Sequence, residues 1–514
     1  MSADAGGAAS PPLAAAEGQA RSWHAELAWL PGVGVLPDVL IEAAGDRFSR
    51  ISPRVSTAEL GPGVRRLAGL TLPGLANAHS HAFHRALRGI TQAGRGTFWT
   101  WRERMYQVAA RLDPDSYLAL ARAVYAEMAL AGISCVGEFH YLHHDPAGQR
   151  YHDPNAMGRA LLVAAAEAGI RITLLDSCYL SGGLDRSGAP VPLAGPQLRF
   201  GDGTPGGWAA RVSALGADEH GALGPAARIG AAIHSVRAVP PDQMQPVVSW
   251  ARQTGAPLHV HLSEQAQENE ACLAAYRQTP AAVLYDAGVL GPRTSVVHAT
   301  HLTSADIGLL GGSEVFACVC PTTEADLADG IGPFSALAAA GCRLTVGSDS
   351  QAVVDLLDET RRIELYQRLA SGERGHFTAE ALGTAMTWDG HASLGWPEAG
   401  EIAPGSLADL VTVGLDSPRL AGAVPSPAGA VPRPAGAVPR PAGAVPGQPA
   451  AASGAGGSGM TPDMSALEAI IFAATAADVR HVVIGGRDVV ADGRHLLVDD
   501  VAAELRSAIG AALA

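Results

Sequence analysis

The sequence predicts an α/β protein: a (β/α)8 barrel of the TIM type, joined to a small β-rich domain built from both chain ends. Two observations predict the barrel. Between about residues 70 and 350, eight short apolar runs recur, and longer helical stretches separate them. Short buried strands that alternate with helices are typical of a parallel sheet, and eight such units favour a barrel. A third observation, the return of short β-like segments after residue 400, predicts the second domain.

The eight apolar runs are the expected barrel strands. They are Leu70–Asn77, Ile133–Glu138, Arg171–Ser177, Arg228–His234, Pro257–Leu262, Thr294–His298, Val315–Cys320 and Leu344–Gly347. Helices are expected between them, among others at Tyr117–Ala131, Met157–Ala168, Gln243–Gln253 and Leu356–Leu369. We place the barrel at residues 71–399.

Both chain ends carry short segments typical of β structure. Near the N-terminus they are Trp23–Trp29, Val39–Glu42 and Arg47–Ile51, and after residue 400 they are Ala408–Val413, Val479–Ile484 and Asp488–Val490. We therefore expect one discontinuous domain from residues 21–70 and 400–498, followed by a C-terminal helix at 499–514.

Two segments are expected to lack a packed structure. Residues 1–20 are rich in Ala, Gly, Ser and Pro, and residues 417–462 contain repeats such as AGAVPSP and AGAVPRP. Neither composition buries enough apolar surface to offset the entropy of ordering. We expect a disordered N-terminus and a flexible insert that is extended where Pro dominates.

The basic residues exclude several enzyme classes, because all 36 are Arg and none is Lys. Schiff-base enzymes, including those that use pyridoxal phosphate, need a Lys amine. P-loop and protein-kinase ATP sites also use Lys. Hydrolases whose two metals are bridged by a carboxylated Lys are excluded for the same reason.

Charge and hydropathy bound the partners and the compartment. The net charge of −14 argues against nucleic acid and anionic membranes as partners. No apolar run reaches the roughly 18 residues of a transmembrane helix, and the first residues do not resemble a secretory signal. The six Cys are scattered without a CxxC pair, which favours reduced thiols in a cytoplasmic protein.

Polar side chains gather where the predicted barrel strands end, which is where barrels place their chemistry. His79 and His81 close the first run, and residues i and i+2 of an extended strand point the same way. His261, His298 and Asp349 follow at runs five, six and eight. His79, His81 and His261 with Asp349 give three His and one carboxylate, a set that suits zinc, with water completing the site.

Each of these His taken alone is more often a buried or surface residue than a ligand. The set, spread over four strand ends, favours a metal site. We interpret His259 as buried structure, because it lies earlier on its strand than His261. Four further histidines form a loop cluster after run two, for which we expect one or two substrate contacts: His140, His143, His144 and His152.

The stretch Pro73–His81, with sequence PGLANAHSH, resembles the first-strand signature of the amidohydrolase superfamily. The later His261, His298 and Asp349 resemble the metal-site pattern of the single-metal deaminase branch of that superfamily. Enzymes of this branch need no carboxylated Lys. The resemblance implies one zinc ion per subunit, held by His79, His81, His261 and Asp349. It also implies that Glu264 shuttles protons and that Asp349, assisted by His298, accepts the proton of the attacking water.

Several separate motifs resemble the formimidoylglutamate deiminase family in order along the chain: HSHAFHRALRG from His79, FWTWR from Phe98, EFHYLHHD from Glu138, HSVR from His234 and CPTTEADL from Cys320. The family implies zinc-dependent hydrolysis of N-formimino-L-glutamate to N-formyl-L-glutamate and ammonia in histidine degradation. Its substrate-binding residues would be His84, Arg102, Tyr141, His234 and Arg237. His84 stands where some relatives carry Gln, and Gln351 stands where others often have His.

A dicarboxylate substrate fits the two arginines, since a guanidinium grips a carboxylate through two hydrogen bonds. Sequence position alone does not show whether Arg102 or Arg237 binds substrate or forms an ordinary surface ion pair. Two alternatives stay open: a related deaminase that acts on a purine, pyrimidine or other amidine-type ring, and a metal-free barrel kept as a binding protein. Dimers are common among such barrels, so a homodimer also stays open.

Overall fold

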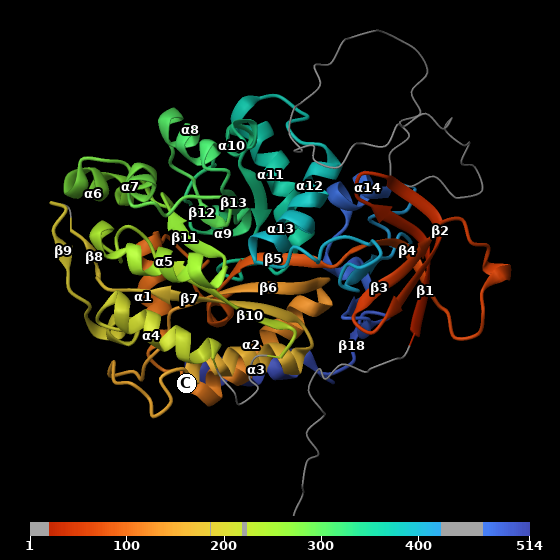
Figure 1. Cartoon of the computed structure of the whole chain (residues 1–514), viewed down its shortest axis with the longest axis horizontal. Coiled ribbons are helices and arrows are strands. Elements are labelled where there is room, and N and C mark those ends of the chain that lie inside the picture. The colour runs from red at the N-terminus through yellow and green to blue at the C-terminus, as the bar shows by residue number, and fades with distance from the viewer. Residues whose placement is uncertain (1–19, 186, 218–223, 423–465) are drawn as a thin grey trace, which may run out of the picture.

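Two eight-stranded sheets organise the computed structural model of the chain, which describes residues 20–185, 187–217, 224–422 and 466–514. One sheet is parallel and curves into a barrel. The other joins strands from both ends of the chain. In Figure 1 the barrel occupies the left, and the second sheet lies at the right, where red N-terminal strands meet blue C-terminal segments. The predicted fold class is confirmed.

The barrel sheet has the order β5-β6-β7-β10-β11-β12-β13-β14 and only parallel pairs. Its strands are β5 (Leu75–Ser80), β6 (Ile133–His140), β7 (Arg171–Cys178), β10 (Ala227–Ile233), β11 (Leu258–Leu262), β12 (Thr294–His298), β13 (Phe316–Val319) and β14 (Arg343–Val346). A parallel bridge between Ser80 and Asp349 closes the ring. The Asp349 N–H donates to the His79 carbonyl at 3.0 Å, and the His81 N–H donates to the Asp349 carbonyl at 3.2 Å. The closure therefore lies at the carboxyl ends of the strands.

Seven of the eight predicted runs coincide with barrel strands, but the first was wrong. Leu70–Asn77 is divided between two sheets, because β4 (Arg65–Pro73) belongs to the second sheet and β5 to the barrel. The two strands meet at Gly74, where an added Cβ would lie 2.3 Å from the Ser134 hydroxyl. β4 is buried from Gly69 onward and β5 is buried throughout, so no polar linker marks the boundary in the sequence.

The barrel is surrounded by helices whose ends follow familiar capping rules. Asp113 caps the longest, α2, by accepting from the Ser116 N–H, and α11 ends at Gly372 in the left-handed conformation. The helices are α1 (Phe98–Ala109), α2 (Pro114–Leu130), α3 (Ala156–Ala168), α4 (Pro205–Gly216), α5 (Gln245–Thr254), α6 (Ala266–Tyr276), α7 (Pro280–Asp286), α8 (Ser304–Gly312), α9 (Pro321–Asp326), α10 (Phe334–Ala340), α11 (Leu356–Ser371), α12 (Ala379–Ala385) and α13 (Trp388–Ser393). The four helices predicted by range appear as α2, α3, α5 and α11.

The second sheet has the order β18-β17-β16-β15-β4-β1-β2-β3. Its further strands are β1 (Ala20–Leu30), β2 (Gly34–Ala44), β3 (Arg47–Ser52), β15 (Leu410–Val413), β16 (Val479–Ile484), β17 (Arg487–Ala491) and β18 (Arg494–His495), and a small hairpin pairs β8 (Gly183–Leu184) with β9 (Pro190–Val191). Trp23, Val39 and Leu410 share its core. The chain ends join because β4 pairs with β15, where the Thr71 and Thr412 hydroxyls lie 2.9 Å apart.

Two C-terminal helices, α14 (Ala466–Ala473) and α15 (Val501–Leu513), complete the described chain. An ion pair of 2.8 Å between Arg122 and Glu504 joins α15 to α2. Residues 1–19 of the predicted disordered N-terminus lie outside the described residues, and Ala20 begins β1. Residues 423–462 of the predicted insert also lie outside them. The predicted domain limits stay predictions.

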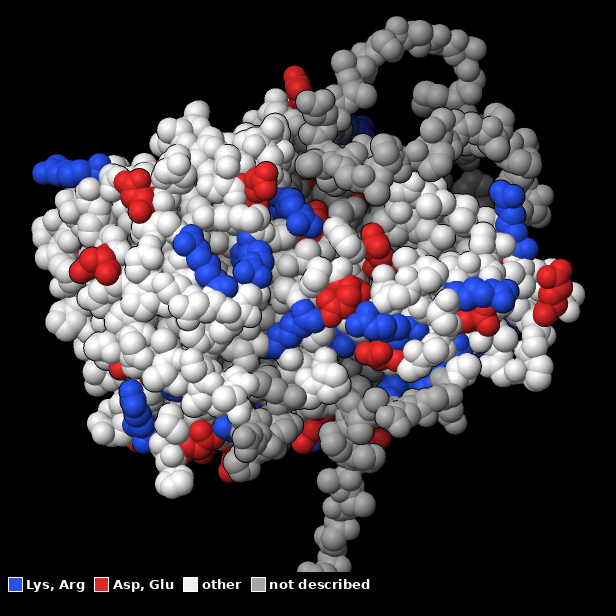
Figure 2. Space-filling model, in the orientation of Figure 1, with Lys and Arg blue, Asp and Glu red and all other residues white. Residues whose placement is uncertain are grey.

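The described surface carries both signs of charge. Figure 2 shows arginines beside acidic side chains, most densely around the second sheet, where Arg65 and Asp488 approach to 2.7 Å. Among the described residues no helix is long and apolar enough to cross a membrane.

Candidate active site

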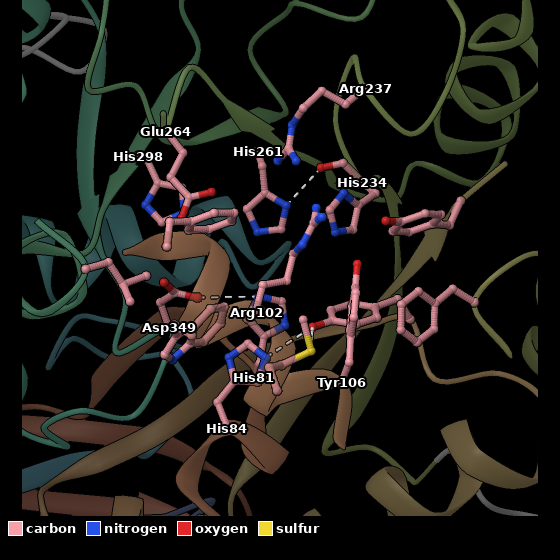
Figure 3. Close-up of a pocket in the computed structure, with 17 residues that line it drawn as sticks. His81, His84, Arg102, Tyr106, His234, Arg237, His261, Glu264, His298 and Asp349 are labelled. Atoms are coloured by element: carbon pink, nitrogen blue, oxygen red, sulfur yellow. Dashed lines mark hydrogen bonds and ion pairs between the residues drawn. The ribbon is translucent and has the colours of Figure 1, made fainter. Parts of the chain in front are cut away.

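A cavity opens at the carboxyl ends of the barrel strands, and its empty space, including the part open to solvent, is about 580 Å³. Figure 3 shows imidazoles, carboxylates and two guanidiniums that face this common space. The lining residues are His81, His84, Phe98, Trp101, Arg102, Met105, Tyr106, Tyr141, Tyr179, Phe200, His234, Arg237, His261, Glu264, His298, Leu327 and Asp349. All residues that the family resemblance implies for metal binding, catalysis and substrate binding are in this set except His79, which is fully buried beside it.

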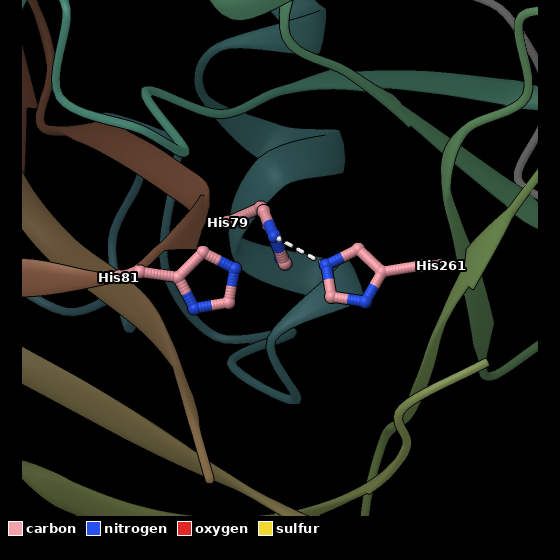
Figure 4. A group of neighbouring side chains, drawn as sticks. All are labelled: His79, His81 and His261. Atoms are coloured by element: carbon pink, nitrogen blue, oxygen red, sulfur yellow. Dashed lines mark hydrogen bonds between the residues drawn. The ribbon is translucent and has the colours of Figure 1, made fainter. Parts of the chain in front are cut away.

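Four side chains from distant parts of the sequence converge at one edge of the cavity. We call His79, His81, His261 and Asp349 the central cluster. Figure 4 shows its three imidazoles, and Figure 3 shows Asp349. Nε2 of His79 lies 3.1 Å from Nε2 of His261, and Oδ1 of Asp349 lies 3.4 Å from Nε2 of both His79 and His81. A tetrahedral ion with bonds of about 2.1 Å separates its ligand atoms by about 3.4 Å. These three distances are close to the spacing expected of ligand atoms that share one ion, and the ligand nitrogens of the three His all lie within 4.8 Å of one another.

Hydrogen bonds behind the imidazoles fix which nitrogen faces the centre. Nδ1–H of His81 donates to the Phe139 carbonyl and Nδ1–H of His261 to the His234 carbonyl, both at 2.8 Å. Each ring then turns an unprotonated Nε2 to the shared point, as a metal ligand requires. Burial lowers the pKa of His79, His81 and His261, which keeps these rings neutral.

The carboxylate of the central cluster is ionised. Burial opposes its charge, but the neighbouring His298 and His81 hold the pKa of Asp349 below its usual value. Three neutral imidazoles and one carboxylate are a donor set that borderline divalent ions prefer. On donor chemistry and spacing, the residues present fit a metal ion.

The strand ends around the cavity adopt unusual backbone conformations. Five non-glycine residues there have positive φ: Ser263 (51°), His298 (71°), Ala299 (52°), Asp349 (39°) and Gln351 (58°). Such conformations cost on the order of 1–3 kcal/mol each and gather at functional sites. Gln351, the predicted departure from related sequences, braces the closure by donating to the Ser80 hydroxyl at 2.9 Å.

Glu264 and His298 form an acid–base pair beside the central cluster. Oε1 of Glu264 lies 3.9 Å from Nε2 of His298. Burial raises the pKa of Glu264 to about 7. Burial opposes a charged His298, yet the nearby Glu264 and Glu324 raise its pKa well above the usual value. A carboxyl that titrates near neutrality can both donate and accept a proton under working conditions.

The wall that carries the arginines also contains residues that the sequence prediction missed. Tyr106 and Trp101 line the cavity from α1, on the same helix as Arg102. The Arg102 guanidinium lies 4.5 Å from the Trp99 ring and 5.4 Å from the Tyr106 ring. The spacing of Arg102 and Tyr106, four residues apart on one helix face, was a signal that could have found Tyr106.

The predicted loop histidines do not reach the cavity, which corrects the expectation of substrate contacts: none of His140, His143, His144 and His152 lines it. The first three belong to what we call the outer cluster, made of His140, His143, His144, Asp176, Asp202 and Arg211. Asp176 accepts from both terminal nitrogens of Arg211 at 2.7 Å and from the Trp208 indole at 3.0 Å. His259, as predicted, is buried structure, with Nε2 3.0 Å from the Ser393 carbonyl.

Comparison with known proteins assigns the family. Residues 70–489 match the amidohydrolase family. The chain belongs to the amidohydrolase family. It is 36% identical to a formimidoylglutamate deiminase of Pseudomonas aeruginosa over 371 residues, which is 70% of this chain and 80% of the relative. It is 30% identical to an 8-oxoguanine deaminase of the same organism over 69% of this chain and 76% of that protein.

Solved structures agree with this assignment. An amidohydrolase from Brucella melitensis matches with a TM-score of 0.81 and 31% identity, over 96% of this chain and all of that one. A zinc-bound adenosine deaminase from Xanthomonas campestris shares the fold, with a TM-score of 0.74 and 23% identity over 98% of each chain. This amidohydrolase is therefore a metal-dependent hydrolytic enzyme, and the alternative of a metal-free binding barrel is set aside.

Proposed function

We propose that this amidohydrolase hydrolyses the C=N bond of N-formimino-L-glutamate, giving N-formyl-L-glutamate and ammonia, as a step of histidine degradation. The observation that carries the proposal is the presence of Arg102 and Arg237 in the same cavity as the central cluster. The substrate has two carboxylates, and guanidiniums bind carboxylates through paired hydrogen bonds. The same lining holds the carboxyls of Glu264 and Asp349, and Nε of Arg237 lies 3.7 Å from Oε1 of the buried Glu268.

We infer zinc as the ion, one per chain, held by the central cluster. Three imidazole nitrogens and one carboxylate oxygen match the ligand preferences of zinc. When bound, a divalent ion of this kind supplies Lewis-acid activation of water at neutral pH.

The protons of the reaction are assigned to three side chains. The formimino carbon gains the oxygen of water, and its nitrogen leaves as ammonia after gaining two protons. Asp349, assisted by His298, takes the proton from the attacking water. Glu264 protonates the imine nitrogen and then helps to expel ammonia. Its pKa of about 7, raised by burial, suits both roles, and such proton delivery contributes typically ~10²–10⁴-fold to the rate.

The remaining polar wall is assigned to substrate orientation. Arg102 and Arg237 hold the carboxylates, and His84, Tyr141 and His234 contact the rest of the molecule. Nε2 of His84 lies 3.1 Å from the Tyr141 hydroxyl, so these two side chains act as a connected pair.

A second candidate is deamination of a nucleobase-like ring, because aromatic side chains also line the cavity, among them Trp101, Tyr106 and Tyr179. Ammonia release from N-formimino-L-glutamate by zinc-loaded protein, set against 8-oxoguanine, guanine, cytosine and adenosine, separates the two. We expect the highest kcat/KM with formiminoglutamate and a large drop with N-formiminoglycine, which lacks one carboxylate. Faster release from any ring substrate would contradict the proposal.

A further inference from the structure

His298 is held between two acidic side chains that come from different elements. Its Nε2 lies 3.9 Å from Oε1 of Glu264, and its Nδ1 lies 3.6 Å from Oε1 of Glu324. Glu264 lines the cavity, whereas Glu324 does not. The imidazole therefore has a side that faces the reaction and a rear side that faces Glu324.

Glu324 is itself fixed in place. It lies on α9 and is fully buried, and its Oε1 accepts a hydrogen bond from the Cys320 N–H at 2.9 Å. The Asp329 N–H donates to the Glu324 carbonyl at 2.8 Å, which ties the following loop to the same residue. Among the described residues the ion-pair partner of the Glu324 carboxylate is His298. A buried carboxylate with so few partners is costly, which suggests a role beyond packing.

The chemistry of imidazole gives that role. A carboxylate beside Nδ1 favours a proton on that nitrogen and fixes the rotation of the ring. The opposite nitrogen, Nε2, then faces Glu264 and the cavity. The 3.6 Å contact is longer than a formed hydrogen bond, and contacts of this kind often shorten in the complex with substrate. Bases oriented by a third group recur in nucleophilic catalysis.

The backbone of His298 makes such an anchor more useful. Its φ of 71° lies in the left-handed region, and the next residue, Ala299, has a φ of 52°. The ring of His298 also stacks on that of His261, with centroids 5.6 Å apart and planes 15° from parallel. A ring on a strained strand end, in contact with a metal ligand, needs a partner that fixes its rotation.

We propose that Glu324 is the positioning residue of His298: it holds the proton on Nδ1 and keeps Nε2 turned to the reacting groups. The inference rests on the hydrolytic chemistry of this site and not on which substrate is used. It adds to the proton carriers a residue that never touches the substrate.

A double-mutant cycle tests the inference. We expect Glu324→Gln to lower kcat about 10- to 100-fold, the usual cost of losing an orienting partner, while KM, zinc content and the thermal unfolding midpoint stay within error. Because Glu324 acts through His298, the same change in a His298→Ala background should cost less than twofold. Any amidine substrate that the wild type hydrolyses serves, so a failed formiminoglutamate assay does not confound the result.

Glu359→Gln is the matched control. Glu359 is also fully buried beside α9, where it accepts from the Thr322 N–H at 2.9 Å. Among the described residues, the ion-pair partners of His298 are Glu264 and Glu324, and Glu359 is not one of them. We expect the kcat of Glu359→Gln to stay within about twofold of the wild type, whereas the kcat of Glu324→Gln should fall about 10- to 100-fold. The inference would be wrong if the effects of Glu324→Gln and His298→Ala on kcat multiplied in the double variant. It would also be wrong if Glu324→Gln and Glu359→Gln lowered kcat equally.

If Glu324→Gln fails to fold, Glu324→Asp replaces it, since the shorter side chain keeps the charge but withdraws it from Nδ1. If His298→Ala has no measurable turnover, the Glu324 variant alone tests the inference. A lower kcat with unchanged KM supports a positioning role, and an unchanged kcat contradicts it.

Discussion

The central and outer clusters both contain His and Asp, yet the carboxylates of the two clusters face different partners. In the outer cluster, His140, His143 and Asp176 lie within ligand distance of one another. In the central cluster the three His do so, and Asp349 lies 3.4 Å from His79 and His81. In the outer cluster, Arg211 occupies the space that a cation would need, since it pairs with Asp176 at 2.7 Å and with Asp202 at 2.9 Å. In the central cluster, the nitrogens instead face one another across 3.1 Å. The comparison teaches that the partner of the carboxylate, and not the count of histidines, separates a metal site from an ion-pair network.

Position in the fold explains the difference. The outer cluster lies where β6 and β7 meet the helices outside the barrel: His140 ends β6, Asp176 is on β7 and Arg211 is on α4. Side chains there must satisfy each other, because burial of an unpaired charge is costly. The central cluster lies at the mouth of the barrel, where polar groups can remain directed at a ligand.

The largest expected effect comes from removing a ligand of the central cluster. We expect His261→Ala to lose bound zinc and to lower kcat/KM by more than about 10³-fold, because Lewis-acid activation supplies several kcal/mol. Elemental analysis and ammonia release measure both. The control is His143→Gln in the outer cluster, which should keep the zinc content and turnover of the wild type. Loss of zinc from the His143 variant would erase the distinction between the clusters.

Within the cavity, a second change separates metal ligands from proton carriers. We expect Glu264→Gln to retain one zinc per chain but to lose ~10²–10⁴-fold in kcat, the usual value of a positioned proton donor. Zinc content and steady-state kinetics on the same preparation check this. Near-normal ammonia release would show that another group delivers the proton.

The outer cluster should respond in stability and not in chemistry. Arg211→Met leaves Asp176 and Asp202 buried without their cation, so we expect the free energy of unfolding to fall by about 3–5 kcal/mol. Denaturant unfolding of the zinc-loaded protein measures it, and zinc per folded chain should be unchanged. If Arg211→Met unfolded like the wild type but contained no zinc, the metal would belong to the outer cluster, and the account would be wrong.

The smallest expected effect comes from replacing Arg102, one of the two arginines that line the cavity. Arg102→Met should raise KM for formiminoglutamate about 10- to 100-fold, since a hydrogen bond to a charged group is worth about 1.5–3 kcal/mol, with little change in kcat. Arg104→Met, on the exposed side of the same helix, is the matched control and should leave KM unchanged. Equal behaviour of the two variants would remove Arg102 from the substrate site.

Much of this site could be predicted because strand ends leave a local signal. His79, His81, His261, His298 and Asp349 each follow an apolar run at the carboxyl end of a strand. The boundary at Gly74 could not be found, since two buried strands of different sheets adjoin without a polar break.

Side chains that act from a distance left no comparable signal. Glu324 and the ionic partners of the outer cluster are brought together only by tertiary packing: Asp176 and Arg211 are 35 residues apart, and His298 and Glu324 come from consecutive βα units. No period or spacing within one element encodes such contacts, so the role of Arg211 in closing the outer cluster to a cation was not foreseen.

The most direct test of the account is an anomalous-diffraction map of crystals of the zinc-loaded protein. The account predicts one strong peak about 2.0–2.2 Å from Nε2 of His79, His81 and His261 and from a carboxylate oxygen of Asp349. A peak among His140, His143 and Asp176 instead, or no peak at the barrel mouth, would contradict it.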